Sequence, residues 1–353
     1  IQSDIHRQVN LISGLKQDRN TLQIAETARV PRTPRDKNIM ETAIIATVIG
    51  LIVAAGGVII FEFFKSTVET SMDINTLLNL PVLGVISRFG SRIRYIPILG
   101  WVIRLVTPQK SYRNLITQNK LRPHSLEEYR TLRTNLLTKS IQSGEKVFLV
   151  TSPTPNDGKS TTVANLAISI ADANRKVLLI DGDLRNPQMH TFFDVPNESG
   201  MLSLLARADN EKYMMPDDVM AQVHQTNVNG LWLMTAGQGI QTPSETLDSD
   251  NTRRFMEILK TGMDFDVILL DTPPCLVVSD SVAFTTFFDT EVLFVVRAGK
   301  TRVQEVARSK DRFRHLPEQN LSVILNGVDL SFEDYYSRVP RKYQMARSPQ
   351  LGV

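Results

Sequence analysis

The second half of the chain alternates short apolar runs with longer stretches in which apolar residues recur at helical spacing. The apolar runs are rich in valine, isoleucine and leucine at consecutive positions, which is typical of strands buried on both faces of a parallel sheet. The predicted strands are residues 147–152, 176–181, 231–235, 266–271, 291–296 and 321–326. This alternation predicts an α/β fold with a doubly wound, mostly parallel sheet, in which ligands bind at the C-terminal ends of the strands.

A helix is predicted immediately before the first of these strands. Ser125 and Glu128 have the spacing of a capping box, which satisfies backbone N–H groups at the start of a helix. The apolar residues that follow are spaced by three and four positions, and they are Leu126, Tyr129, Leu132 and Leu136. We therefore expect a globular domain from residue 125 to residue 334.

An uncharged apolar run, Ala43 to Phe61, lies near the N-terminus between Glu41 and Glu62. As a helix it would rise roughly 28 Å, close to the thickness of the hydrocarbon core of a bilayer. The alternative is a buried core helix, but such a helix seldom stays apolar on every face for so many turns. We therefore predict a transmembrane helix over residues 39–64.

The residues before this helix also carry apolar side chains at helical and heptad-like spacings. These residues are Ile5, Val9, Ile12, Leu15 and Leu22. We interpret them as the end of a longer coiled or paired helix. The chain begins at Ile1 without a methionine, so we expect it to be a fragment of a larger polypeptide.

Basic residues without acidic neighbours follow the apolar helix. No aspartate or glutamate occurs between Ile74 and Leu126, whereas arginine and lysine recur there. Residues 65–124 are therefore predicted to be a basic juxtamembrane linker. Within it, residues 82–106 combine apolar and basic side chains, which suits either an element lying on anionic lipid headgroups or an ordinary linker.

Composition excludes several classes of function. The net charge of +3 is too small to argue for nucleic acid, and we expect no nucleic-acid partner. The single cysteine, Cys275, excludes an intramolecular disulfide framework and fits a reducing compartment. The sequence has no His–Cys metal cluster and no G-x-S-x-G nucleophile elbow, and it lacks the H-R-D and D-F-G triplets of eukaryotic-type protein kinases.

Candidate chemistry is concentrated at the ends of predicted strands. The first motif, Pro153 to Thr161, lies between a strand and a helix expected to begin near Thr161. Backbone N–H groups at a helix N-terminus suit phosphate oxygens, Lys159 adds a positive charge, and the Ser160 hydroxyl is a ligand for Mg²⁺. The loop departs from G-x-x-x-x-G-K-[ST] because Pro153 stands at the first glycine position. The residues predicted to bind ATP are Asn156, Asp157, Gly158, Lys159, Ser160 and Thr161.

Two further motifs place carboxylates at strand ends. Asp181 and Asp183 follow one strand, where a pair of carboxylates can hold hydrated Mg²⁺ or one of them can take a proton from an incoming hydroxyl. Asp271 follows apolar strand residues and needs a cation to offset the cost of its burial, which a Mg²⁺ site would supply. A helix-capping aspartate beside a solvated one would explain Asp181 and Asp183 alone, but it does not explain all the motifs in this order.

Together these motifs resemble those of the bacterial tyrosine kinases that regulate chain length in capsular and exopolysaccharide synthesis. Residues 153–161 resemble the family's Walker A motif, Asp181-x-Asp183-x-Arg185 its Walker A′ motif, and Leu270-Asp271-Thr272-Pro273 its Walker B motif. Upstream, residues 31–34 resemble the proline-rich end of the periplasmic Wzz-type domain, and residues 80–84 the start of the cytoplasmic part. The resemblance divides the chain into a periplasmic helical remnant (1–38), the transmembrane helix (39–64), the linker (65–124), the P-loop kinase domain (125–334) and a flexible tail (335–353).

The resemblance also implies roles for residues outside these motifs. Glu127, Arg130 and Arg133 match the E-x-x-R-x-x-R helix through which subunits of the family contact one another in a ring, although an ion-paired helix surface has the same pattern. Asn326 is implied to contact adenine. The resemblance also implies that each subunit phosphorylates the tail of a neighbouring subunit, at Tyr335, Tyr336 and Tyr343. Two departures from the family are this thin tyrosine cluster and Asn156-Asp157, which stands where Gly-Glu is common.

The expected function is ATP-dependent autophosphorylation on tyrosine. Lys159 and the loop amides would hold the β- and γ-phosphates, while Ser160, Asp183 and Asp271 would organise Mg²⁺. Asp181 would orient or deprotonate the tyrosine, although Asp181 and Asp183 could exchange roles. Because ATP and magnesium are cytoplasmic, we expect a cytoplasmic kinase domain at the bacterial inner membrane. The partners implied by the resemblance are a homo-oligomeric ring, a polysaccharide export machinery and a phosphatase.

Two other functions stay open at this point. One is a partition or septum-positioning ATPase of the ParA/MinD type, but Thr154 stands where the signature lysine of that class would lie. The other is a chain-length scaffold whose nucleotide domain only senses ATP. The intact set of Lys159, Asp181, Asp183 and Asp271 argues against such an inactive site.

Overall fold

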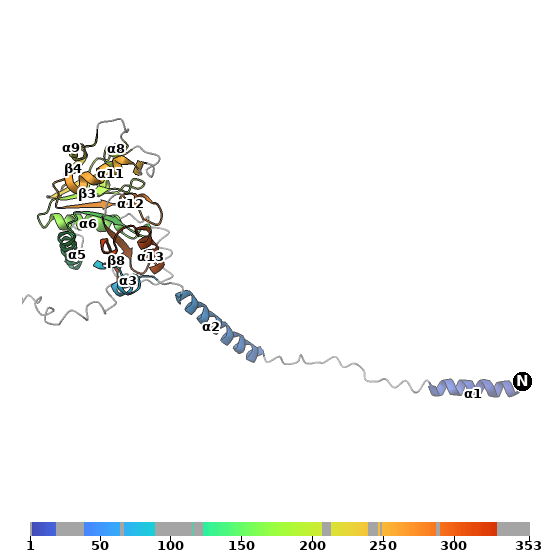
Figure 1. The fold of residues 1–353 in the computed structure, drawn as a ribbon. Coiled ribbons are helices and arrows are strands. Elements are labelled where there is room, and N and C mark those ends of the chain that lie inside the picture. The colour runs from blue at the N-terminus through green and yellow to red at the C-terminus, as the bar shows by residue number, and fades with distance from the viewer. Residues whose placement is uncertain are drawn as a thin grey trace, which may run out of the picture. The chain divides into compact units, whose positions relative to one another are not determined.

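The computed structural model describes residues 2–18, 39–63, 67–88, 115, 123–206, 213–238, 246–247, 249–286 and 290–329 (Figure 1). The chain divides into two compact units, Ile1–Phe64 and Lys65–Val353. The predicted tail (335–353), with its tyrosines, lies outside the described residues, as do residues 19–38 and most of 89–122.

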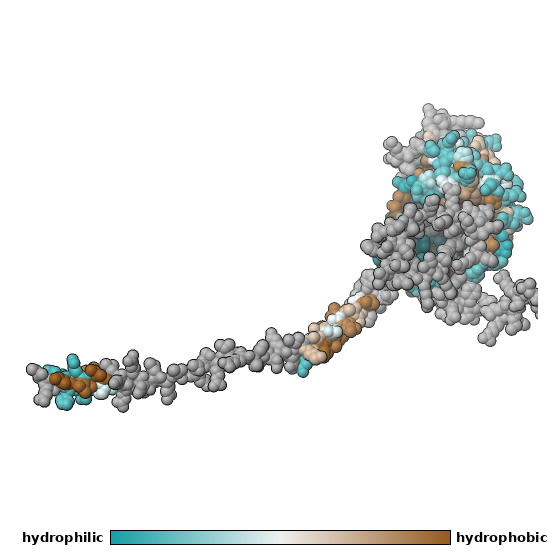
Figure 2. All heavy atoms as spheres, turned by 180° about the vertical axis from the view of Figure 1, so that it is seen from behind, coloured by the Kyte–Doolittle hydropathy of each residue, from teal (hydrophilic) through white to brown (hydrophobic). Residues whose placement is uncertain are grey.

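In the first unit, the described residues form helices α1 (Gln2–Asp18) and α2 (Ile39–Phe63). Helix α2 is long and apolar enough over Met40–Val58 to cross a membrane, by length and composition. Side chains along this span are exposed rather than buried against the protein, and most of its visible face is pale or brown in Figure 2. A helix is therefore present where one was predicted, and its passage through a membrane stays a prediction.

The second unit is built around one sheet with the strand order β1-β8-β7-β2-β6-β3-β5-β4. Neighbouring strands are parallel except for β4, which runs antiparallel to β5. The strands are β1 (Val82–Ser87), β2 (Val147–Thr151), β3 (Val177–Asp181), β4 (Val223–Gln225), β5 (Leu231–Met234), β6 (Val267–Asp271), β7 (Glu291–Arg297) and β8 (Leu321–Val328). Each strand predicted from the sequence is present, and the doubly wound, mostly parallel α/β fold is confirmed.

Helices cover both faces of this sheet, which explains why its strands are continuously apolar. One core contains residues of α5 (Pro123–Ser143) and α6 (Lys159–Ala171). The other contains residues of α3 (Ser71–Leu78), α8 (Met201–Leu205), α11 (Asp250–Glu257) and α13 (Val303–Arg312). The shorter elements are α7 (Met189–Phe193), α9 (Pro216–Met220), the π-helical turn η2 (Ile258–Gly262), α12 (Asp280–Ala283) and the 3-10 turn η3 (Glu318–Asn320).

Part of the predicted basic linker belongs to this domain, which corrects the linker assignment for residues 67–88. Strand β1 pairs in parallel with β8 at the edge of the sheet, and Val68, Ile74 and Leu80 are buried in the core. The segment 82–87 is therefore a strand of the sheet, with Ile86 and Ser87 buried and the residues before them half-buried. The absence of acidic residues was a misleading signal, because an edge strand needs apolar side chains but no negative charge. Strand β4 was also missed because it is short and polar.

The predicted capping box at the start of α5 is wrong. The helix begins at Pro123, so Ser125 lies within its first turn. The Glu128 carboxylate instead accepts hydrogen bonds from Ser87 at the end of β1, from the backbone N–H at 3.0 Å and from the hydroxyl at 2.9 Å. Proline suits a first helical position because its missing N–H would have no partner there. The apolar face of the helix was predicted correctly, since Tyr129, Leu132 and Leu136 are fully buried.

Replacement of Leu132 by alanine tests how strongly α5 is packed on the edge strand. The Leu132 side chain fills the space above Gly84, where a Cβ would lie 2.9 Å from its Cδ1 atom. We expect Leu132→Ala to lower the free energy of unfolding by about 2–5 kcal/mol, because it leaves a cavity in a fully buried site. Urea unfolding followed by circular dichroism measures this loss.

The matched control is Ile141→Ala in the same helix, where the side chain is 82% exposed. Its effect should stay within about 0.5 kcal/mol. Equal effects of the two substitutions would show that α5 is not packed as described.

Candidate functional site

The predicted motifs meet at one edge of the sheet. Strand β6 lies between β2 and β3, and Asp271 is in register with Val150 on one side and with Asp181 on the other. All these strands are parallel, so their C-terminal ends converge. Thr272 fixes the segment after β6, because its N–H and its hydroxyl both donate to the Val150 carbonyl oxygen, at 2.9 and 3.0 Å.

The loop between β2 and α6 has the backbone geometry of a phosphate-binding loop. Asn156 and Gly158 adopt left-handed conformations, with φ of 62° and 92°, which asparagine and glycine tolerate best. A Cβ at Gly158 would collide with the side-chain amide of Asn326. Helix α6 begins at Lys159, two positions before the expected Thr161, so the loop N–H groups lie at the N-terminus of a long helix.

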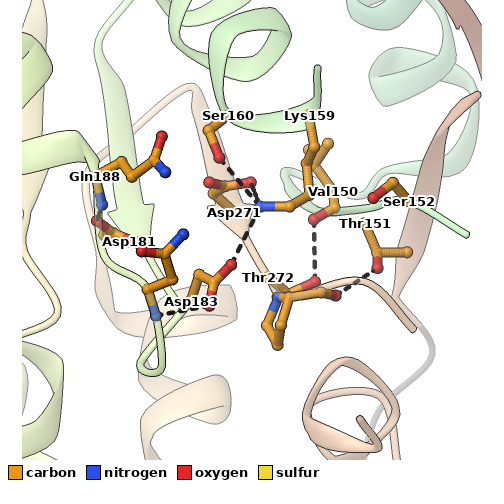
Figure 3. A network of polar contacts seen from close by, with 12 residues as sticks. Val150, Thr151, Ser152, Lys159, Ser160, Asp181, Asp183, Gln188, Asp271 and Thr272 are labelled. Atoms are coloured by element: carbon orange, nitrogen blue, oxygen red, sulfur yellow. Dashed lines mark hydrogen bonds and ion pairs between the residues drawn. The ribbon is translucent and has the colours of Figure 1, made fainter. Parts of the chain in front are cut away.

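Lys159 is the cation at the centre of this edge. Its ammonium lies 2.5 Å from Asp271 Oδ1, 3.2 Å from Ser160 Oγ and 3.8 Å from Asp183 Oδ2 (Figure 3). The Lys159 side chain is only 7% exposed, so these contacts form where little water competes. The structure thus brings together residues from all the predicted motifs.

Asp181 combines a structural contact with an unsatisfied oxygen. Its Oδ2 accepts hydrogen bonds from the N–H groups of Gln188 and Met189, both at 2.9 Å, at the start of α7. Its Oδ1 is buried without a hydrogen-bond partner among the residues that the structure describes. Burial, and secondarily the nearby Asp271 carboxylate, raises the pKa of Asp181 to about 7. The alternative of a helix-capping aspartate therefore holds for one oxygen only.

Asp183 and Asp271 differ from Asp181 because each lies near the Lys159 ammonium. Asp183 Oδ1 accepts from the Asn186 N–H at 3.2 Å. Burial raises the pKa of Asp271, and the contact with Lys159 opposes this rise. The segments that carry Asp183 and Asp271 are joined directly, since the Gly182 N–H donates to the Asp271 carbonyl oxygen at 2.7 Å.

Carboxylates alone do not form a metal site here. Within the described part of the chain, no group of three His, Cys, Asp or Glu residues is arranged to hold a metal ion. Mg²⁺ commonly binds through one or two carboxylates together with water and substrate phosphates. Asp183, Asp271 and the Ser160 hydroxyl could contribute to such a mixed coordination.

Side chains of β7 and of the turn after it contact the loop, and they were not predicted from the sequence. The Arg297 guanidinium donates to the Asn156 carbonyl oxygen at 3.2 Å, and the Lys300 ammonium lies 2.9 Å from Asp157 Oδ1. Asn326, expected to contact adenine, donates from its amide to the Asp157 carbonyl oxygen at 2.9 Å. The only signal in the sequence was the placement of these polar residues at strand ends, where ligand sites form.

The residues of the predicted subunit contact lie on α5 but differ in their surroundings. Arg130 and Glu127 form an ion pair of 2.7 Å, with side chains 57% and 47% exposed. The Arg133 guanidinium instead donates to the Ser169 carbonyl oxygen near the end of α6, at 2.8 Å. Glu127 and Arg130 are thus accessible, whereas Arg133 also fastens α5 to α6.

A strand, a glycine-containing loop and a helix, bordered by carboxylates at neighbouring strand ends, define a nucleotide-binding domain of the P-loop class. A family model described as an AAA domain matches residues 156–307. Tyrosine-protein kinase YwqD of Bacillus subtilis is 35% identical over 226 residues, which cover 64% of this chain and 90% of that protein. The chain belongs to the family of bacterial tyrosine kinases.

A solved structure extends this similarity to the fold. The kinase domain of Escherichia coli tyrosine kinase ETK is 28% identical, with a TM-score of 0.58, over 74% of this chain and 96% of that domain. Some relatives are much longer. Tyrosine-protein kinase ptk of Acinetobacter johnsonii is 24% identical over 314 residues, and the chain spans 40% of its length.

Replacement of Gly182 by alanine tests the contact between the two carboxylate segments. A Cβ at Gly182 would lie 2.8 Å from the Asp271 carbonyl oxygen and 2.9 Å from Leu270 Cδ1, so these segments would have to separate. We expect Gly182→Ala to weaken ADP binding by about tenfold, because a displacement of the site by a fraction of an ångström weakens several contacts at once. Calorimetric titration measures the affinity.

Gly144→Ala serves as the control, because Gly144 has a φ of 71° but nothing within 4 Å of its Cβ position. It should cost about 1 kcal/mol of stability through backbone strain and leave ADP affinity unchanged. If Gly144→Ala also weakened ADP binding, the effect of Gly182→Ala would reflect general destabilisation rather than the contact between the carboxylate segments.

Proposed function

We propose that this chain transfers the γ-phosphoryl group of ATP to tyrosine hydroxyls, including those of its own C-terminal tail. The observation that carries this proposal is the convergence of Lys159, Asp183 and Asp271 beside the N-terminus of α6, in a chain related to tyrosine kinases. The arrangement supplies a cation for phosphates and carboxylates for magnesium at one place. Positioning and charge neutralisation provide most of the catalysis in phosphoryl transfer.

The residues present fit ATP and Mg²⁺. Glycine at position 158 lets the loop keep this path, because a Cβ there would collide with the side-chain amide of Asn326. Residues 156–161 would hold the phosphates through their N–H groups and the Lys159 ammonium. Ser160, Asp183 and Asp271 would hold magnesium, directly or through water. When bound, magnesium neutralises charge that develops on the phosphates.

Asp181 is the proposed acceptor for the tyrosine proton. Hydrogen bonds from α7 fix its Oδ2, while Oδ1 is buried without a partner in the described residues. The tyrosine oxygen would bond to the γ-phosphorus as the bond to the ADP oxygen breaks, and its proton would pass to Oδ1. Asp183 suits this role less well, because its Oδ2 lies 3.8 Å from the Lys159 ammonium.

Replacement of Lys159 by methionine tests the assignment of the site. We expect Lys159→Met to reduce phosphotyrosine formation by at least about a thousandfold, because the cation that meets the phosphates is lost. Incubation with radiolabelled ATP followed by phosphotyrosine analysis measures the reaction.

A matched control is Lys176→Met, which removes an exposed lysine paired with Asp264, just before β3. Its activity should match that of the wild type. Undiminished labelling of Lys159→Met would contradict the site, and release of free phosphate without labelled protein would indicate an ATPase of the ParA/MinD type instead.

We also propose that transfer occurs between subunits of a homo-oligomeric ring, with α5 at the contact. Surface ion pairs such as Glu127–Arg130 contribute at most about 1 kcal/mol to stability, so folding alone does not demand this pair. Its exposure leaves it accessible to a neighbouring subunit. Arg133 would support the contact by holding α5 against α6.

A mixing experiment tests transfer between subunits. One chain carries Lys159→Met and keeps its tail, whereas the other is intact at Lys159 and has Tyr335, Tyr336 and Tyr343 replaced by phenylalanine. We expect the Lys159→Met chain to be labelled in the mixture but not when it is incubated alone. It lacks an active site, which the other chain supplies, and the other chain lacks the tail tyrosines. Mass spectrometry of the separated chains assigns the phosphate.

Adding Arg130→Ala to both chains should reduce this labelling if α5 is the contact. Labelling of neither chain would contradict transfer to the tail in trans. Labelling that is insensitive to Arg130→Ala would place the subunit contact elsewhere on the surface.

We also propose a membrane location for the protein and a role in polysaccharide export. Helix α2 would anchor the chain in the bacterial inner membrane, with the second unit on the cytoplasmic side where ATP and magnesium are found. The resemblance of the motifs to polysaccharide chain-length regulators supports a role in capsular or exopolysaccharide export. A phosphatase would then be needed to reverse the modification of the tail.

A further inference from the structure

Three consecutive carbonyl groups of the phosphate loop are held by side chains from distant parts of the sequence. The Lys300 ammonium donates to the Pro155 oxygen at 2.5 Å, the Arg297 guanidinium to the Asn156 oxygen at 3.2 Å, and the Asn326 amide to the Asp157 oxygen at 2.9 Å. The donors lie at the end of β7, in the turn after it, and in β8. Strand β7 lies beside β2, and β8 lies on the other side of β7. The outer side of the loop is therefore fastened at successive peptide groups.

These contacts fix the direction of the loop N–H groups. In a planar trans peptide, the carbonyl of one residue and the N–H of the next point in opposite directions. Holding the carbonyls of residues 155–157 therefore turns the N–H groups of residues 156–158 away from β7 and β8. None of these three N–H groups donates to an acceptor within the described residues, so they are available for an anion.

Lys300 also neutralises a carboxylate inside the loop. Asp157 is 1% exposed, and it accepts from the Thr154 N–H at 3.1 Å and lies 2.9 Å from the Lys300 ammonium. A negative charge buried here without a partner would be costly and would repel phosphates. The turn that carries Lys300 is itself anchored, because the Gly299 N–H donates to the Val68 carbonyl oxygen at 2.9 Å.

We infer that Lys300, supported by Arg297 and Asn326, is a positioning residue of the nucleotide site that acts through the loop backbone and Asp157. This inference rests on the proposed function, since it assumes that the loop binds nucleotide phosphates. It assigns Asn326 to the loop rather than to adenine. It also explains how the loop keeps its shape with Pro153 at the first glycine position and an acidic residue before Gly158.

The test compares ADP binding, with magnesium, by the full chain in detergent and by its variants, using isothermal titration calorimetry. We expect Lys300→Met to weaken binding about tenfold or more, because a charge-assisted hydrogen bond is lost and Asp157 becomes unpaired. In an Asp157→Asn background the same substitution should cost less than about threefold, because the amide keeps an acceptor for Thr154 and carries no charge. A purely structural role of Lys300 would not produce this coupling.

Arg302→Met is the matched control, because it removes an exposed positive charge near Lys300. It should change ADP affinity less than about twofold, since exposed charges are screened. If Lys300→Met does not fold, recovery of folding and ADP binding by adding Asp157→Asn supports the inference, and no recovery overturns it.

The remaining outcomes separate this inference from the proposed function. Suppose that the wild type binds ADP and Lys159→Met does not. If Lys300→Met then has the same ADP affinity as Arg302→Met, the positioning role is overturned and the proposed function stands. The positioning role is also overturned if Lys300→Met lowers ADP affinity equally with aspartate and with asparagine at position 157. Lys300 would then act without Asp157. A wild-type chain that binds no ADP overturns both.

Discussion

The ion pair between Lys159 and Asp271 joins the start of α6 to the end of β6 where little water reaches. The two side chains are 7% and 2% exposed, and their charged atoms lie 2.5 Å apart. Burying either charge without the other would cost several kcal/mol. The phosphate loop before α6 and the segment after β6 are therefore held over the same edge of the sheet. Asp183 and Ser160 contact the same ammonium, so the arrangement of the whole site depends on this pair.

Most of the fold and the centre of the site could be predicted because their signals are local. Each strand buried on both faces is a continuous apolar run, and the ends of parallel strands converge whatever the loops do. Asp181, Asp183 and Asp271 were therefore found from their places at strand ends. Of the alternatives weighed for Asp181, helix capping is confirmed for Oδ2, which accepts from the start of α7. A role of Oδ1 toward magnesium or a proton stays a prediction.

The features that escaped prediction depend on contacts between residues far apart in the sequence. Strand β1 could not be told from a basic linker, because only its pairing with β8 defines it. Glu128 has the spacing of a capping residue but binds Ser87 of β1, and no helix rule contains that partner. Lys300 meets Asp157 across 143 positions of sequence. Such contacts arise from the order of strands in the sheet, which local patterns specify only weakly.

The charges around the loop form two ion pairs, which differ in how nucleotide binding affects them. Lys300 neutralises Asp157 on the outer side of the loop, where the pair can persist when a nucleotide binds, because both groups also bond to the loop itself. Lys159 neutralises Asp271 on the inner side, and it cannot turn to a phosphate without leaving a buried carboxylate unpaired. Under the proposed function, a divalent cation beside Asp271 offsets that loss. Phosphate and metal binding should then favour each other, because each removes the penalty that the other alone would incur.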